Sequence, residues 1–381
     1  MLKITRIKIN GFRRLVDVDL PLNPLCVMIG PNGVGKTSLL DVFSLLAASA
    51  RGELETKIAE YEGLFSVLTR GVANQLNVEI ECTLEQCSLI YCLVIERQEF
   101  AYQIRREFLR TSTSDETYFI DRMGSKEYRF DLDKKDNVNK KTEFSVTKPT
   151  ETSLSQISPR EAVADAFKKT IESALFMGNL FTGPRSQIRL PQRLRRTYLP
   201  GSQAEDLVSC LYTLRETSRD RFETLIATLQ AAFPDFERIE FPPIFDGYIA
   251  ADWKSKHFGQ SLHAYELSEG TLRFLWLATL LLSPALSTVT MIDEPEVSLH
   301  PELMSLLVDL MRGASRHTQL IVATHSDRLI RFLKPEEVLI ADMTDEGYAK
   351  FTWGSDLDLD EWLAEYSLDE LWEMKRLGGV P

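Results

Sequence analysis

The sequence of 381 residues predicts an α/β fold, with a mainly parallel sheet flanked by helices and antiparallel strands at the N-terminus. Three observations predict it. An apolar run at 25–29 continues into a glycine-rich turn and then into an amphipathic helix over 35–50. After residue 288, strand-like and helix-like segments alternate. Between 74 and 152, short β-like runs are separated by polar turns.

The N-terminal segments divide by their apolar pattern. Residues 2–9 alternate between apolar and polar side chains, which predicts a half-exposed strand, and 16–20 is its predicted hairpin partner. The run 25–29 is apolar throughout, which is typical of a strand buried on both faces. The companions of this strand in a parallel sheet come only after residue 288, so we expect the chain between them to interrupt one core.

This interruption gives the predicted domain organisation. We expect the core to comprise residues 1–73 and 236–355. Residues 74–158 form a predicted β-rich insertion and 159–235 a predicted helical lobe. Residues 356–381 form a predicted helical tail.

Composition limits the classes of function. The net charge of −12 argues against a protein that coats nucleic acid with its whole surface, so any such contact requires a local basic patch. No signal peptide is evident, and the longest apolar run, 274–282, falls far short of the roughly 20 residues that span a bilayer. With five cysteines and no paired framework, we expect a cytoplasmic protein without membrane contact.

The turn after the buried strand reads GPNGVGKT over residues 30–37 and fits the pattern G-x-x-x-x-G-K-S/T. Its glycines allow backbone N–H groups to turn toward phosphates, and the following helix directs its positive end to the same place. Lys36 is predicted to reach the β- and γ-phosphates of a nucleotide, and Thr37 to bind Mg²⁺. The predicted nucleotide-binding residues of this segment are Asn32, Gly33, Gly35, Lys36, Thr37 and Ser38.

Acidic residues close a later strand, in the segment MIDE. Asp293 is predicted to hold Mg²⁺, and Glu294 to orient or deprotonate an attacking water. Upstream, LSEGT includes Ser268 and Gly270 and precedes an apolar helix; an ordinary helix N-cap is the alternative interpretation of Ser268. His325 follows the next strand, where a lone histidine could also be structural.

Together and in this chain order, the four elements resemble the Walker A loop, signature motif, Walker B strand and switch histidine of the ABC-type ATPase superfamily. The resemblance implies ATP and Mg²⁺ as cofactors and two heads that face each other head to tail. Ser268 and Gly270 would then bind the γ-phosphate of ATP on the other head, and His325 would contact it in cis. We therefore expect a homodimer or higher even oligomer that forms with ATP.

The details narrow the resemblance. Transporters usually carry LSGGQ where this chain has LSEGT, and EPEVSLHP at 294–301 is more similar to the soluble RecF and OLD (overcoming lysogenisation defect) ATPases. About 40 residues follow position 341, too few for the Toprim nuclease of full-length OLD proteins, so the chain most resembles stand-alone AAA_21-type ATPases. This implies a slow switch ATPase, not itself a nuclease, that regulates a separate effector, a nuclease or toxin, in anti-phage defence. The alternative is a RecF-like DNA-binding ATPase in repair.

One basic stretch stands out in the acidic chain. Five arginines fall within residues 185–196. They could form a nucleic-acid-binding edge, or Arg185 could reach a phosphate of ATP, or the stretch could be a solvated loop paired with acidic groups. The five are Arg185, Arg189, Arg193, Arg195 and Arg196.

Overall fold

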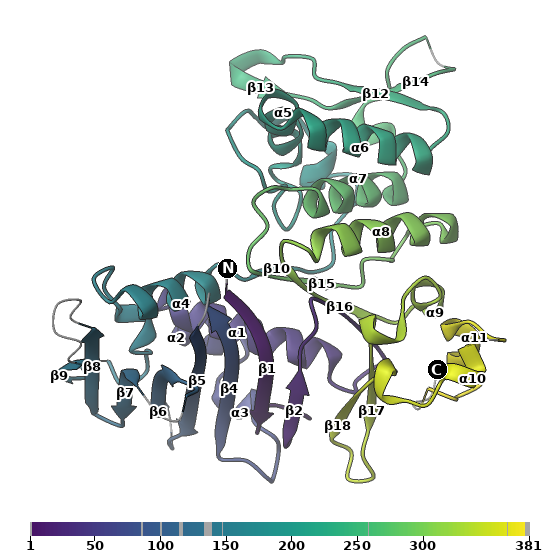
Figure 1. The fold of residues 1–381 in the computed structure, drawn as a ribbon. Helices are drawn as coiled ribbons and strands as arrows, with labels where there is room; N and C mark the ends of the chain where they lie inside the picture. Colours follow the sequence, from purple (N-terminus) through teal and green to yellow (C-terminus); the bar gives the residue numbers. More distant parts are fainter. Residues whose placement is uncertain are drawn as a thin grey trace.

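The computed structural model describes residues 2–84, 87–99, 101–113, 117–132, 139–146, 148–257, 259–363 and 365–377. Two sheets form the lower body of the molecule, and a lobe of helices and short strands stands above it (Figure 1). The six-stranded sheet is mainly parallel and the eight-stranded sheet is antiparallel, which confirms the predicted fold class. Within the described residues, no helix combines the length and apolarity needed to cross a bilayer.

The six-stranded sheet has the order β10-β15-β16-β3-β17-β18. Strand β3 pairs in parallel with both neighbours, and only β18 runs antiparallel. The carboxyl ends of the parallel strands therefore meet at one edge, where α/β proteins bind their ligands. The strands are β3 (Leu25–Ile29), β10 (Leu175–Met177), β15 (Val289–Asp293), β16 (Gln319–Thr324), β17 (Val338–Met343) and β18 (Ala349–Trp353).

Strand β3 is buried at all five positions, as its apolar run predicts. Cys26 and Met28 face the core cluster beneath α1, and Val27 faces the cluster beneath the helices of the other side. Alternate side chains thus pack into two different cores, one on each face of the sheet. Strand β3 is therefore a central strand that is buried from both sides. The flanking helices are α1 (Lys36–Arg51) on one face, and α7 (Glu269–Leu281), α8 (Met304–Ala314) and α9 (Asp327–Ile330) on the other.

The eight-stranded sheet unites the N-terminal strands with the predicted β-rich insertion. Its order is β2-β1-β4-β5-β6-β7-β8-β9, and β1 pairs antiparallel with both β2 and β4. The insertion therefore extends a sheet that begins at the N-terminus. The strands are β1 (Leu2–Asn10), β2 (Val18–Pro21), β4 (Gln75–Leu84), β5 (Cys87–Arg97), β6 (Tyr102–Thr111), β7 (Tyr118–Met123), β8 (Lys126–Leu132) and β9 (Asn139–Ser145).

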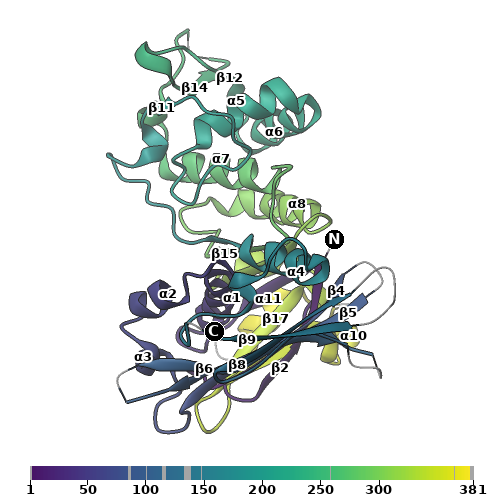
Figure 2. The same cartoon turned by 90° about the vertical axis from the view of Figure 1, so that its left-hand side faces the viewer.

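The upper lobe differs from the predicted boundaries. Helix α4 (Ala162–Glu172) packs on α1, and β10 pairs with β15, so the first part of 159–235 lies with the core. Conversely, β12 and β14, placed in the core by prediction, lie beside α5 and α6 in both views (Figures 1 and 2). The lobe contains β11 (Gln192–Arg193), α5 (Leu207–Thr217), α6 (Arg219–Ala232), β12 (Phe236–Glu240), β13 (Tyr248–Ile249) and β14 (Asp252–Ser255).

Short helices complete the body. The predicted C-terminal tail forms α10 (Asp360–Leu363) and α11 (Leu368–Glu373), and α11 packs against α9, where Leu371 and Trp372 are buried. Residues 378–381 of the predicted tail lie outside the described residues. Helices α2 (Leu54–Glu60) and α3 (Leu64–Val67) follow α1 and lie beside the eight-stranded sheet (Figure 2).

A buried glutamine ties the two sheets together. Gln319, at the start of β16, donates from Nε2 to the carbonyl of Ile4 at 2.8 Å and accepts from the N–H of Ile4 at 3.2 Å. Its side-chain amide therefore binds Ile4 of β1 in the way that the backbone of a paired strand would. Since Gln319 is 4% exposed, water does not compete for these bonds.

We expect Gln319→Met, which keeps the side chain's length, to lower the free energy of unfolding by about 2–4 kcal/mol, because two backbone groups of Ile4 lose their partner in the interior. Urea unfolding measures this. Gly313→Ala in helix α8 is the control, since a Cβ there meets nothing within 4 Å and should stabilise the helix. A Gln319→Met protein as stable as wild type would contradict this role.

Candidate functional site

The loop between β3 and α1 has a backbone that other groups can approach closely. Gly33 and Gly35 have positive φ angles of 78° and 120°, which side chains rarely adopt. At Gly30, a Cβ would lie 2.1 Å from the carbonyl oxygen of Ala341. No side chain caps the N-terminus of α1, so the N–H groups of its first turn stay available to an anion.

Lys36 is the first residue of α1, and its side chain folds back into this loop, where it is only 4% exposed. Its Nζ donates to the carbonyls of Gly30, at 2.5 Å, and Pro31, at 3.0 Å. Burial lowers the pKa of Lys36 to about 8, against the opposing effect of the Asp293 and Glu294 carboxylates. Among the described residues, no carboxylate forms an ion pair with Lys36. The lysine is thus a buried cation to which an anionic ligand would be a direct partner.

The two predicted acidic residues lie where β15 ends. Burial, and then the charge of Glu294, raise the pKa of Asp293 to about 6, while Lys36 lowers it. Glu294 has a φ of 49°, in the left-handed region, while its N–H still donates to Ala323 of β16 at 2.8 Å. Such a backbone costs on the order of 1 kcal/mol and is concentrated at functional sites.

His325 joins the loop to the acidic pair. Its Nδ1 lies 3.2 Å from Nζ of Lys36, and its Nε2 lies 3.5 Å from Oε1 of Glu294. Burial and the charge of Lys36 lower the pKa of His325, which favours the neutral ring. Because an ammonium only donates, Nδ1 must accept, and the Nε2–H then faces the carboxylate. Three predicted residues from three segments therefore converge.

Two residues that the sequence analysis did not single out support this group. The carboxylate of Glu296 accepts from Oγ1 of Thr324, at 2.5 Å, and from the N–H of His325, at 3.2 Å. Burial raises the pKa of Glu296, and its other oxygen has no described partner. Glu296 thereby fixes the backbone that carries His325. The repeated acid in EPE, directly after the strand, was the available signal.

Arg273 on helix α7 is a second unpredicted residue, and it is 3% exposed. It donates to the side chain of Asn179 at 3.0 Å and to the carbonyl of Glu294 at 3.2 Å. Burial lowers the pKa of Arg273. The guanidinium therefore joins α7 to the backbone of Glu294 and to the segment after β10.

The signature residues occupy the start of α7. Ser268 caps the helix by accepting from the N–H of Thr271 at 3.1 Å, as the alternative interpretation predicts. At Gly270, a Cβ would lie 2.5 Å from the carbonyl of Ser298, so glycine lets α7 approach the segment after β15. In both views, α7 and α1 lie on opposite sides of β15 (Figures 1 and 2). Described hydrogen bonds do not link Ser268 to Lys36.

The other predicted binding residues line the same loop and helix. Asn32 and Thr37 are exposed, whereas Ser38 is 7% exposed. The described residues contain no cluster of three or more His, Cys, Asp or Glu side chains that could hold a metal ion. Mg²⁺ does not require such a cluster, since it is commonly held by one or two protein oxygens together with phosphates and water. The oxygen atoms of Thr37 and Asp293 fit this chemistry.

The arginine stretch is in part structural. Arg189 donates to the carbonyls of Thr182, at 2.8 Å, and Leu267, at 2.9 Å, so it anchors the residue directly before Ser268. Arg195 pairs with Asp206, and Arg196 contacts the hydroxyl of Tyr198. The pairing of Arg195 with Asp206 matches the third alternative, whereas Arg189 binds backbone carbonyls, which none of the three alternatives predicts. Arg185 and Arg193 are exposed, and the described contacts leave the first two alternatives open for them.

A comparison with known families decides the assignment. The family model AAA_21, described as "AAA domain, putative AbiEii toxin, Type IV TA system", matches residues 25–331. The chain belongs to the AAA_21 family. The match begins at β3 and ends just after α9, and it includes every predicted site residue of this AAA_21 protein.

Individual relatives agree with this assignment. An OLD nuclease of Thermus scotoductus is 50% identical over 43 residues, which are 11% of this chain and 8% of that protein. The head of an SMC protein, bound to the C-winged helix domain of ScpA, superposes with a TM-score of 0.58 at 13% identity over 93% of this chain and 99% of the other.

A second structure shares the fold. An Smc head with an extended coiled coil, bound to the C-terminal domain of ScpA derived from Pyrococcus furiosus, gives a TM-score of 0.54 at 12% identity over 96% and 98% of the two chains. At such identities the likeness shows the fold alone. The AAA_21 protein therefore has the fold of a P-loop ABC-type ATPase head, and its family and the local match to an OLD nuclease agree with the RecF/OLD resemblance that its motifs predict.

The shifted pKa values predict opposite proton exchange at two pH values when Mg-ATP binds. At pH 8.5, Lys36, with a pKa of about 8, is partly neutral, and phosphate charge should make it take up a proton. At pH 6, Asp293, with a pKa of about 6, is partly protonated. A cation bound to its carboxylate should make it release that proton to the buffer. Calorimetry in buffers of different ionisation enthalpy measures both. Equal proton exchange at the two pH values would contradict this electrostatic account.

Proposed function

We propose that the AAA_21 protein binds ATP with Mg²⁺ and hydrolyses it at a site completed by a second copy of the chain. The observation that carries this proposal is the convergence of Lys36, Glu294 and His325 at the carboxyl edge of the parallel sheet. The buried cation can bind an anionic substrate. The carboxylate can accept a proton, and the neutral imidazole can position the carboxylate. Neither a simple glycine turn nor a lone structural histidine requires this grouping.

The loop and helix α1 would hold the phosphates. Lys36 would exchange its bonds to Gly30 and Pro31 for phosphate oxygens, and the N–H groups at the start of α1 would face the same charge. Thr37 and Asp293 would hold Mg²⁺, which when bound offsets the charge of the phosphates. The remaining proposed contacts come from Asn32, Gly33, Gly35 and Ser38.

Glu294 and His325 would serve the hydrolytic step. The carboxylate of Glu294 would orient a water and accept its proton, while Nε2–H of His325 lies near enough to hold that carboxylate in position. Glu296 and Arg273 would act as positioning residues, because each binds the backbone of one of these two groups. Their contribution is orientation rather than contact with ATP.

Ser268 and Gly270 would act in trans. The separation of α7 from α1 across β15 favours completion of each site by the signature helix of a partner copy, in a head-to-tail homodimer or a higher even oligomer. The N-terminus of α7, a helix of 13 residues capped by Ser268, would then face the γ-phosphate as a second positive helix end. Turnover would be slow, because each site would wait for its partner.

For the biological role, we propose that the dimer regulates a separate effector, a nuclease or toxin, in anti-phage defence within the cytoplasm. Two comparisons support this: the family description mentions a toxin, and a local relative is an OLD nuclease. The second candidate is a RecF-like DNA-binding ATPase in repair. Exposed Arg185 and Arg193 favour it, but the net charge of −12 and the internal contacts of Arg189 and Arg195 weigh against it.

We expect Glu294→Gln to bind ATP normally but to hydrolyse it roughly 10²–10⁴-fold more slowly, because the general base is lost. It should accumulate as an ATP-bound dimer. Light scattering with and without Mg-ATP measures the mass, and phosphate release measures turnover. Glu302→Gln is the matched control, since that carboxylate lies in the same segment and its side chain is 88% exposed.

Either of two results would overturn this proposal. Normal turnover in Glu294→Gln would exclude the base. An unchanged monomeric mass, in a variant shown to bind ATP, would exclude the composite site.

A further inference from the structure

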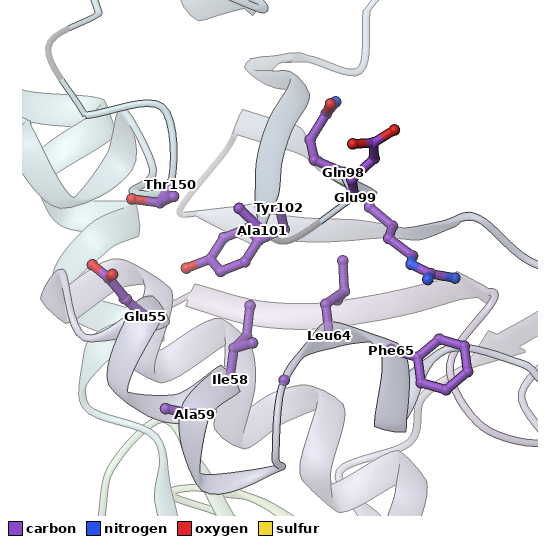
Figure 3. Close-up of a pocket in the computed structure, with 12 residues that line it drawn as sticks. Glu55, Ile58, Ala59, Leu64, Phe65, Gln98, Glu99, Ala101, Tyr102 and Thr150 are labelled. Carbon is purple, nitrogen blue, oxygen red and sulfur yellow. The ribbon is translucent and has the colours of Figure 1, made fainter.

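A cavity of about 410 Å³ lies apart from the candidate site, between helices α2 and α3 on one side and the end of β5 and the start of β6 on the other (Figure 3). Its size falls in the range of small-molecule sites. None of the residues proposed for ATP lines it. The lining residues used below are Glu55, Ile58, Leu64, Phe65, Ala101 and Tyr102.

The middle of the cavity is apolar. Ile58 and Leu64 are 3% and 4% exposed, and Figure 3 shows both between the α2 side and the Phe65 side. Phe65 is 59% exposed, and the guanidinium of Arg97 lies 4.6 Å from the centre of its ring. This end of the cavity therefore carries an aromatic face and the opposite charges of Arg97 and Glu99, while its middle offers hydrocarbon contact.

Two polar atoms at or behind the opposite end have no partner among the described residues. One is the hydroxyl of Tyr102, a residue that is 8% exposed, and Figure 3 shows it directed toward Glu55 and Thr150. The other belongs to Glu151, which is 7% exposed and lies outside the lining: one of its carboxylate oxygens accepts from the N–H of Glu55 at 3.3 Å, and the other is the unpartnered atom. Burial, then the charges of Glu151 and Glu55, raise the pKa of Tyr102, so both carboxylates act on this hydroxyl.

These atoms favour a ligand group that donates hydrogen bonds. An unpartnered buried carboxylate oxygen or hydroxyl costs on the order of 1–3 kcal/mol, and both are relieved by a donor. The carboxylates of Glu55 and Glu151 repel an anion from this end, whereas the other end carries both Arg97 and Glu99 and so has no net charge. A primary ammonium has three donors and no acceptor, and an alkyl chain attached to it matches the apolar middle.

We propose that this cavity binds a primary alkylammonium group, with the ammonium at Glu55 and Tyr102 and the chain against Ile58 and Leu64. A lysine side chain of another protein and a free amine present the same chemistry. The site uses no nucleotide-binding residue, so it stands or falls independently of the proposed ATPase mechanism. The helices that line it, α2 and α3, follow α1 in the chain.

The test titrates n-pentylammonium chloride into the full chain at low ionic strength without ATP, by ligand-observed NMR and calorimetry. A second arm titrates the peptide N-acetyl-Ala-Lys-Ala-amide. Pentanoate and n-pentanol are the charge controls. We expect saturable one-to-one binding of the ammonium compounds, and no binding of pentanoate.

Variants locate the site. Tyr102→Phe and Glu55→Gln should each weaken ammonium binding roughly tenfold, because a hydrogen bond to a charged group is lost. Tyr102→Phe should fold as well as wild type, since it removes an unpartnered hydroxyl, and thermal unfolding checks this. Glu60→Gln, on the same helix but outside the lining, should bind like wild type.

The outcomes are decisive. Tighter binding of the lysine peptide identifies a protein partner as the source, and equal binding identifies a free amine. The proposal is overturned if neither compound saturates, if n-pentanol binds as well as the amine, or if Tyr102→Phe and Glu55→Gln bind like wild type.

Discussion

The contact between Lys36 and His325 is the interaction on which the rest of the site depends. It exists because β3 and β16 are neighbours in a parallel sheet, so that the glycine-rich loop after one strand and the histidine after the other emerge at the same edge. β15 is the next strand, and it brings Asp293 and Glu294 to the same place. Burial then makes these charges sensitive to one another, lowering the pKa of Lys36 and raising that of Asp293. A ligand that supplies phosphate charge and a divalent cation relieves both.

The same edge is joined to the upper lobe by charged groups rather than by apolar packing alone. Arg273 binds the carbonyl of Glu294 from helix α7, and Arg189 binds the carbonyl of Leu267 just before Ser268. If a partner copy displaced α7, the backbone of Glu294 would therefore shift with it. The φ of Glu294, 49°, already lies outside the regions that non-glycine residues commonly adopt. This continuity offers a physical route by which assembly could control hydrolysis, and hydrolysis could control what docks on the lobe.

Much of this could be predicted from the sequence, because β3 is apolar throughout, β15 and β16 are mostly apolar, and the loop and acidic motifs are local patterns. The rest depends on contacts between distant residues. Asn179 and Arg273 meet across 94 positions, and β10, a strand of three residues, is recognisable only by its pairing with β15. The arginine stretch is open to three interpretations for the same reason: three of the carbonyls that Arg189 binds lie 75–78 positions away.

Mixing two inactive variants shows whether ATP is held between Lys36 of one copy and Ser268 of another. Lys36→Ala should lack nucleotide binding, and Ser268→Arg should retain it but block the partner's site. A mixed dimer contains one intact composite site, so ATPase activity should return on mixing while each variant alone stays inactive. If native mass spectrometry shows mixed dimers and activity does not return, the two residues do not form one site, and Ser268 is only the cap of α7.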